Sequence, residues 1–245
     1  MELMKRIIAF LWLPVALFLI GCAALQGNLG DVLRTGSNEG GTLDEPTVVA
    51  GIKEALRVGT ENTVLSTSRL DGYLGNQLIR IAIPDQLASA ASTLRQVGLG
   101  GQVDELEVGM NRAAELAAGE ARQVFWDAIC GMTISDAFGI LRGDDTAATD
   151  YFHGRTYATL ETRFHPIVQE KIQEIGLSRV YSRIADAYNS LPLAGRSRLV
   201  NLDDYVTERA LSGLFTVLAQ EEQKIRRDPL ARTTDLLRRV FGAKE

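Results

Sequence analysis

Apolar residues recur at intervals of three and four along most of the chain, and this spacing predicts α-helices. Glycine, proline and asparagine interrupt the pattern where helices are expected to end. The pattern favours an all-α, bundle-like single domain of about eight helices within residues 47–245. We expect Gly119 to bend the third helix and Pro166 to kink the fifth. The expected helices cover residues 47–66, 85–97, 102–130, 134–141, 144–175, 178–190, 203–226 and 229–241.

One short segment departs from the helical pattern. In residues 78–84 isoleucine recurs at every second position, as side chains on one face of a β-strand do. This segment follows a stretch rich in turn residues. A strand needs a partner, and residues 198–201 are the only candidate. We therefore expect either a pair of strands or an extended segment that packs on the helices without a strand partner. Arg80 lies in this otherwise apolar run, so its guanidinium must either reach water or bind a buried carboxylate.

The first residues have the pattern of an export signal. Two basic residues precede the apolar stretch 7–20, which is shorter than the roughly 20 residues that span a bilayer. We expect residues 1–21 to be a signal peptide. Its last residues, Leu19–Cys22, resemble the bacterial lipobox, which would make Cys22 the acylated first residue of the mature protein. An uncleaved anchor and ordinary secretory cleavage are the alternatives.

The expected lipidation also suggests a location. Residues 22–46 would be the acylated cysteine and a glycine-rich flexible tether. Ala23 stands where an aspartate would resemble the inner-membrane retention signal of enterobacterial lipoproteins. We therefore expect the outer membrane of a two-membrane bacterium, on the face toward the periplasm. The expected partners are the membrane, through Cys22, and an envelope protein or a lipid.

The charge of the chain excludes one large class of partner. The 245 residues carry a formal charge of −5, so the positive field with which most nucleic-acid binders neutralise phosphates is missing, and no nucleic-acid partner is expected. The distribution is uneven, because residues 224–245 carry seven basic and three acidic residues. This basic end would either dock on anionic lipid or an acidic partner, or pair with acids of the same fold.

Few residues suit metal or nucleophilic chemistry. Two cysteines and two histidines are too few for the usual four-ligand zinc site with residues to spare, and we expect no metal and no cofactor. Cys130 lies in an apolar context that predicts a buried, inert thiol. His153 follows two aromatic residues, and His165 precedes Pro166, where its ring is expected to bind a carbonyl freed by the proline.

Several segments are distinctive in combination: Ala55–Asn62, Gly72–Leu74 with Ile79–Ile81, Met110–Glu115, Tyr188–Pro192, Asp204–Thr207 and Ile225–Leu237. Together they resemble an uncharacterised family of bacterial lipoproteins called domain of unknown function 4197. The resemblance spans nearly the whole mature body, and it implies no activity, cofactor or catalytic residue. The suggestive polar residues of these segments form our candidate binding cluster, which consists of Arg80, Asn111, Arg112, Glu115, Tyr205 and Arg232.

Three classes of function fit these observations. The leading hypothesis is a lipid-anchored, non-catalytic binding or envelope-organising module. The alternative is a carrier of an apolar ligand, such as a lipid, in a cavity between helices, because a packed core and a cavity wall both need apolar faces. The third is an unrecognised enzyme, for which the sequence offers no clear set of catalytic residues.

Overall fold

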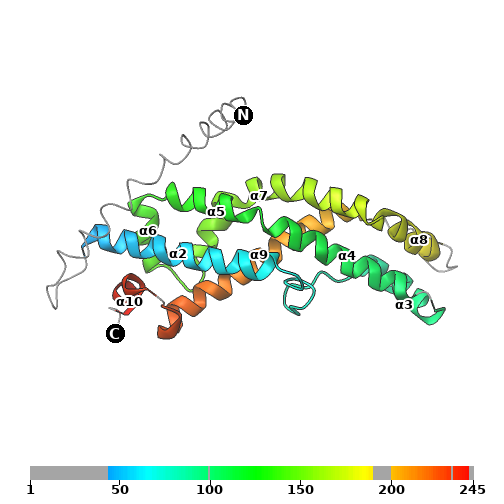
Figure 1. Ribbon diagram of the computed structural model, residues 1–245, viewed down its shortest axis with the longest axis horizontal. Coiled ribbons are helices and arrows are strands. Elements are labelled where there is room, and N and C mark those ends of the chain that lie inside the picture. The colour runs from blue at the N-terminus through cyan, green and yellow to red at the C-terminus, as the bar shows by residue number, and fades with distance from the viewer. Residues whose placement is uncertain (1–43, 99, 190–199, 233, 243–245) are drawn as a thin grey trace, which may run out of the picture. The chain divides into compact units, whose positions relative to one another are not determined.

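A computed structural model describes residues 44–98, 100–189, 200–232 and 234–242. The predicted signal peptide, Cys22 and nearly all of the tether lie outside these residues. The described chain is all-α, as predicted, and contains no strand within those ranges. Its elements are α2 (Glu45–Ser68), the 3₁₀ turn η2 (Asp85–Leu87), α3 (Ala88–Gln96), α4 (Gly100–Ala118), α5 (Ala121–Cys130), α6 (Ile134–Arg142), α7 (Ala147–Glu174), α8 (Leu177–Asn189), α9 (Leu202–Arg227), the 3₁₀ turn η3 (Pro229–Ala231) and α10 (Asp235–Gly242) (Figure 1).

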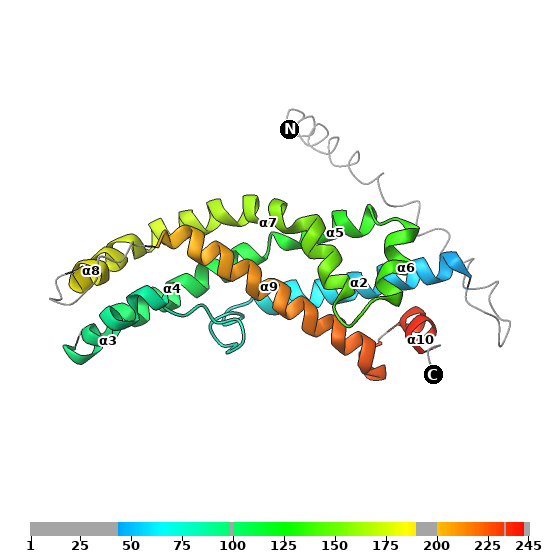
Figure 2. The same cartoon turned by 180° about the vertical axis from the view of Figure 1, so that it is seen from behind.

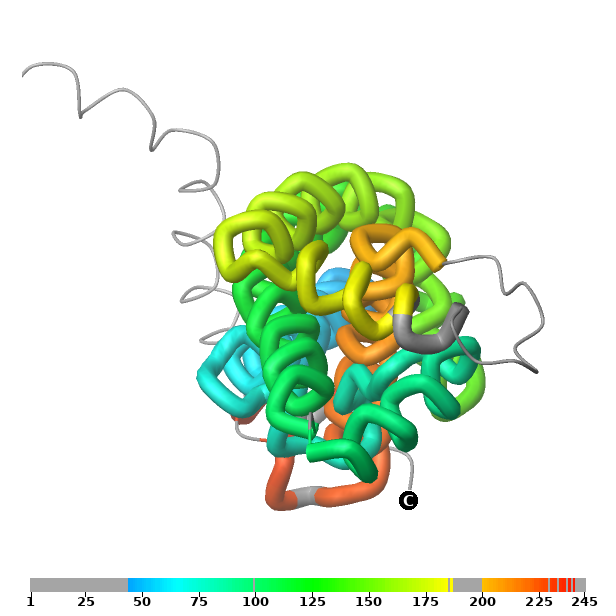
Figure 3. Tube along the Cα trace, turned by 90° about the vertical axis from the view of Figure 1, so that its right-hand side faces the viewer, coloured from blue at the N-terminus to red at the C-terminus, as the bar shows by residue number. Residues whose placement is uncertain are grey.

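Helix α9 is the central element of this body. It packs against α7, α2 and α4, and Figure 2 shows it crossing the other helices on its way toward α10. Seen end-on in Figure 3, α9 lies beside α7 and α4. Its buried residues fall on two adjoining stripes, one through Ala210 and Leu214 and the other through Leu211 and Phe215. So broad an apolar face is typical of a helix with neighbours on several sides.

The predicted helix over residues 102–130 is two helices. Helix α4 ends at Ala118 and α5 begins at Ala121, so the chain breaks where a bend at Gly119 was expected. Glycine weakens the helix here, and the amide of Glu120 turns back to the carbonyl of Ala117 at 3.0 Å, a spacing of three residues instead of four. Helix α7, in contrast, continues across Pro166.

The prediction of one helix over residues 229–241 was wrong. A 3₁₀ turn follows α9, and α10 starts only at Asp235. The Asp228 carboxylate accepts a hydrogen bond from the amide of Leu230 at 2.8 Å, as an N-cap does, but only a 3₁₀ turn that ends at Ala231 follows it. Arg232 then binds the last carbonyls of α9, those of Ile225 at 3.2 Å and Arg226 at 3.0 Å.

Helix α10 packs on α2 through a glycine. A Cβ atom added at Gly51 of α2 would lie 2.3 Å from Cγ2 of Val240 of α10. A Cβ at this position would require the side chain of Val240 to move. We therefore expect the packing of the C-terminal helix on α2 to be sensitive to substitution at Gly51.

Candidate functional site

The chain between α2 and η2 forms a tightly wound loop, residues 69–84, which we call the clasped loop. Its turns are closed by backbone hydrogen bonds, such as those from Gly72 to Arg69 and from Gly75 to Asp71, both 3.0 Å long. Asp71 has a φ of 62°, in the left-handed region that side chains rarely occupy. A Cβ at Gly72 would lie 2.5 Å from two carbonyl oxygens of α2. The loop therefore has one closely specified path.

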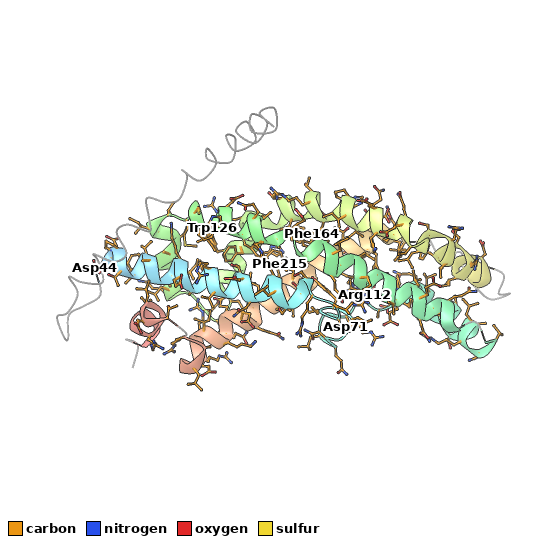
Figure 4. The ribbon with its side chains drawn as sticks, in the orientation of Figure 1. Asp44, Asp71, Arg112, Trp126, Phe164 and Phe215 are labelled. Carbon is orange, nitrogen blue, oxygen red and sulfur yellow. The ribbon has the colours of Figure 1, made fainter. Side chains whose placement is uncertain are left out.

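The first half of the clasped loop is held by α4. The buried carboxylate of Glu115 accepts hydrogen bonds from the amides of Tyr73 (3.2 Å) and Leu74 (3.3 Å). Its other oxygen binds Arg112 at 2.6 Å, and Arg112 also binds Asp71 at 2.7 Å. Figure 4 shows Asp71 on the loop and Arg112 on the adjacent helix. One carboxylate and one guanidinium thus tie the loop to α4.

The second half is held by side chains that take the place of a neighbouring strand. The fully buried amide of Asn111 accepts from the Ile81 amide at 2.9 Å and donates to the Ile81 carbonyl at 2.8 Å. The Tyr205 hydroxyl donates to the carbonyl of Ala82 at 3.0 Å. The expectation of a packed extended segment is therefore correct for residues 80–84. Residues 198–199 of the proposed partner strand lie outside the described residues.

Tyr73 anchors the loop to the central helix. Its side chain is fully buried, and its hydroxyl donates to the Ala210 carbonyl at 2.6 Å. Burial is the main cause that raises the pKa of Tyr73 above its ordinary value, and the charge of Glu115 adds to it. Gly213 of α9 makes room for the ring, since a Cβ there would lie 2.7 Å from Cε1 of Tyr73.

Five of the six candidate binding residues lie in this loop or beside it, and the sixth, Arg232, does not. Arg80 pairs with Glu107 at 2.7 Å while remaining half exposed, so its guanidinium both reaches water and binds a carboxylate. Arg232 lies at the end of α9 and caps that helix. The sequence analysis missed Asp71, Tyr73 and Glu107. The turn-rich stretch that contains Asp71 and Tyr73 is a weak signal, and no pattern in the sequence pairs Glu107 with Arg80.

The other residues weighed for chemistry have structural surroundings. The ring of His153 lies 4.8 Å from Tyr157 and 4.9 Å from Phe215, centroid to centroid. Nε2 of His165 lies 3.1 Å from Oδ1 of Asp204, so this ring faces a carboxylate and not the carbonyl that we expected. Cys130 is exposed, so the prediction of a buried thiol was wrong. It is the last residue of α5 and lies on the side opposite the buried Val124, Phe125 and Ile129.

The basic C-terminal region forms ion pairs inside the fold. Arg226 binds the buried carboxylate of Glu222 at 2.8 Å, and this carboxylate also accepts hydrogen bonds from the first amides of α7, including Ala148 at 2.9 Å. Arg227 pairs with Asp145. These contacts support the interpretation in which the C-terminal cations neutralise acids of the same fold.

Two hollows matter for function. An apolar cavity of about 30 Å³ lies between α2 and α9. A polar hollow of about 300 Å³ lies between the last turn of α2 and the clasped loop. Among the described residues, no group of three or more histidine, cysteine, aspartate or glutamate side chains is placed to hold a metal ion. Within the same residues no single helix is long and apolar enough to cross a membrane, although the bent pair Gly100–Cys130 and Ile134–Arg142 passes that test together.

Comparison with known proteins identifies the family. A family model described as "Protein of unknown function (DUF4197)" matches residues 42–242, which include every described residue. No curated protein and no solved structure matches the chain significantly. The chain therefore belongs to the DUF4197 family.

Proposed function

We propose that this protein is a lipid-anchored lipoprotein of the bacterial envelope whose helical body is a non-catalytic binding module. The anchor rests on the lipobox-like Leu19–Cys22 and the glycine-rich stretch that follows. The residue after Cys22 favours the outer membrane, facing the periplasm. Replacing Cys22 with serine is expected to move the chain from the membrane to the soluble fraction of lysed cells, because two or more acyl chains are what makes such anchoring stable.

The binding role rests on one observation: two leucine side chains of the clasped loop are exposed to solvent. Leu70 is 71% exposed and Leu78 is 70% exposed, although buried polar side chains fix the backbone on which they stand. A fully bonded buried network makes a segment rigid. A rigid loop binds without the entropic cost of ordering it, and burying one leucine contributes about 1.5–3 kcal/mol. Leu70 and Leu78 therefore suit contact with another protein.

The same network argues against a chemical role for the candidate cluster. Asn111, Glu115 and Tyr205 each bind backbone groups of the clasped loop, and the second oxygen of Glu115 binds Arg112. Their role in this proposal is to position the loop. They do not touch a ligand.

Photo-crosslinking in living cells tests the proposal. The full chain carries a benzophenone amino acid in place of Leu78, and a matched variant carries it in place of Leu230, which is 89% exposed in η3. We expect a discrete crosslinked product from position 78 that is absent from position 230 and weakened by Leu70→Ser. Products of equal yield from both positions, or none from position 78, would contradict the binding role of the loop.

A further inference from the structure

The clasped loop contains a dipeptide with a chemistry of its own. Asp71 precedes Gly72, and the sequence has no other Asp–Gly or Asn–Gly dipeptide. An aspartate before glycine can cyclise, because glycine has no Cβ to shield its backbone nitrogen from the neighbouring carboxyl carbon. The side chain of Asp71 is 56% exposed, so water reaches its carboxyl group. The loop therefore holds the atoms needed to convert aspartate into isoaspartate.

This conversion takes two steps and needs no reagent besides water. In the first step the backbone nitrogen of Gly72 bonds to Cγ of Asp71, and the amide hydrogen leaves as water with the hydroxyl of the protonated carboxyl group. In the second step water opens the ring. Cleavage at Cγ restores aspartate, whereas cleavage at the main-chain carbonyl of Asp71 leaves the chain connected through the side chain, as isoaspartate. The mass is unchanged, because the water lost in ring closure is regained.

Three contacts of the folded loop oppose the ring closure. The Gly72 nitrogen can approach Cγ only after rotation about the Cα–C bond of Asp71. Hydrogen bonds hold both ends of the peptide group that would turn, because the Gly72 N–H donates to the carbonyl of Arg69 at 3.0 Å. The Asp71 carbonyl accepts from the Gly75 amide, also at 3.0 Å. The carboxylate is held by Arg112 of α4 at 2.7 Å, in a charge-assisted hydrogen bond (Figure 4).

We propose that Asp71–Gly72 is a latent site of isoaspartate formation, which the pair with Arg112 and the closed turns of the clasped loop protect. Isoaspartate places Cβ in the main chain and lengthens it by one atom. The loop has little room for this atom, since a Cβ at Gly72 would already lie 2.5 Å from two carbonyl oxygens. The modified loop would not return to its path, and Leu70 would lose its fixed position. The inference goes beyond the proposed function, because this chemistry needs no partner.

Timed incubation of the full chain tests the inference. The protein is kept in detergent at neutral pH, folded or unfolded by guanidinium chloride, and isoaspartate at position 71 is measured by peptide mapping with electron-transfer fragmentation. We expect conversion to be at least about tenfold faster in the unfolded chain, which has lost all three contacts. Arg112→Gln should raise the rate in the folded protein about fivefold. Arg95→Gln, which removes the exposed pair with Asp104, is the matched control and should leave the rate unchanged.

The outcomes separate this inference from the proposed function. Equal rates in the folded and unfolded wild type would overturn the inference, and this comparison stands even where Arg112→Gln does not fold. Equal rates in the folded wild type and a folded Arg112→Gln variant would also overturn it, as would the same acceleration by Arg95→Gln. None of these results changes the crosslink expected from position 78. A missing crosslink would in turn count against the binding role alone.

Discussion

Glu115 is the residue on which the clasped loop depends most. Its carboxylate receives the amides of Tyr73 and Leu74 and the guanidinium of Arg112 in a buried position. Glu115→Gln keeps the shape but replaces one acceptor oxygen with a donor, so we expect the free energy of unfolding to fall by about 2 kcal/mol. Urea unfolding measures this change. Arg95→Gln, which removes the exposed pair between Arg95 and Asp104, is the control and should cost about 0.5 kcal/mol or less. Equal costs would show that the carboxylate does not hold the loop.

At this scale the sequence grouped residues that lie together, but it did not reveal their contacts. Asn111, Arg112 and Glu115 were singled out because they occur in a segment that resembles the family, and they do lie together beside the loop. Their function as holders of backbone groups was not predictable, because Glu115 is 42 residues from Tyr73 and Asn111 is 30 residues from Ile81. Helical periodicity shows which side of α4 is buried, but it does not identify the loop that covers it.

Helix α10 packs on α2 over Gly51. Alanine normally stabilises a helix relative to glycine by up to about 1 kcal/mol, so Gly51→Ala would stabilise an isolated α2. In the protein the new Cβ meets Val240 at 2.3 Å, and we expect α10 to detach. Hydrogen exchange of residues 235–242 should rise at least tenfold, and Gly51→Ala with Val240→Ala should recover part of the protection.

Gly154→Ala provides the control for that experiment. Gly154 lies in α7 with nothing within 4 Å of an added Cβ, so this variant should keep α10 protected and be as stable as the wild type or more so. If Gly51→Ala behaves in the same way, the close crossing of α2 and α10 is not what positions the C-terminal helix.

The helices themselves were largely predictable, and the exceptions have local causes. The expected boundaries of α2, α6 and α9 are within about two residues of those observed, since apolar spacing and capping residues mark them. A capping box between Thr133 and Asp136 starts α6. The break after Ala118 and the turn after α9 depend on short-range carbonyl contacts, which apolar spacing does not encode.

For the molecule as a whole, the volume of the space between the helices distinguishes a packed core from a ligand cavity. The apolar space between α2 and α9 measures about 30 Å³, which is about one water molecule's share of liquid volume. An acyl chain would enter only if these helices separated. Burial of the apolar faces therefore contributes to stability and leaves no preformed lipid site there.

The body is accordingly expected to carry no lipid, and native mass spectrometry tests this directly. Residues 24–245, exported to a bacterial periplasm and purified without detergent, should give the mass of the bare chain. Gly59→Ala is the matched variant, because its Cβ would project toward the cavity and meet Ile225 Cδ1 at an ordinary contact distance of 3.7 Å. It should leave the mass pattern unchanged and raise stability by about 1 kcal/mol, the helix-propensity gain of alanine over glycine. A phospholipid adduct on the wild type that Gly59→Ala removes would reverse the conclusion. It would show that α2 and α9 open around a ligand, and that the apolar faces between them serve a carrier.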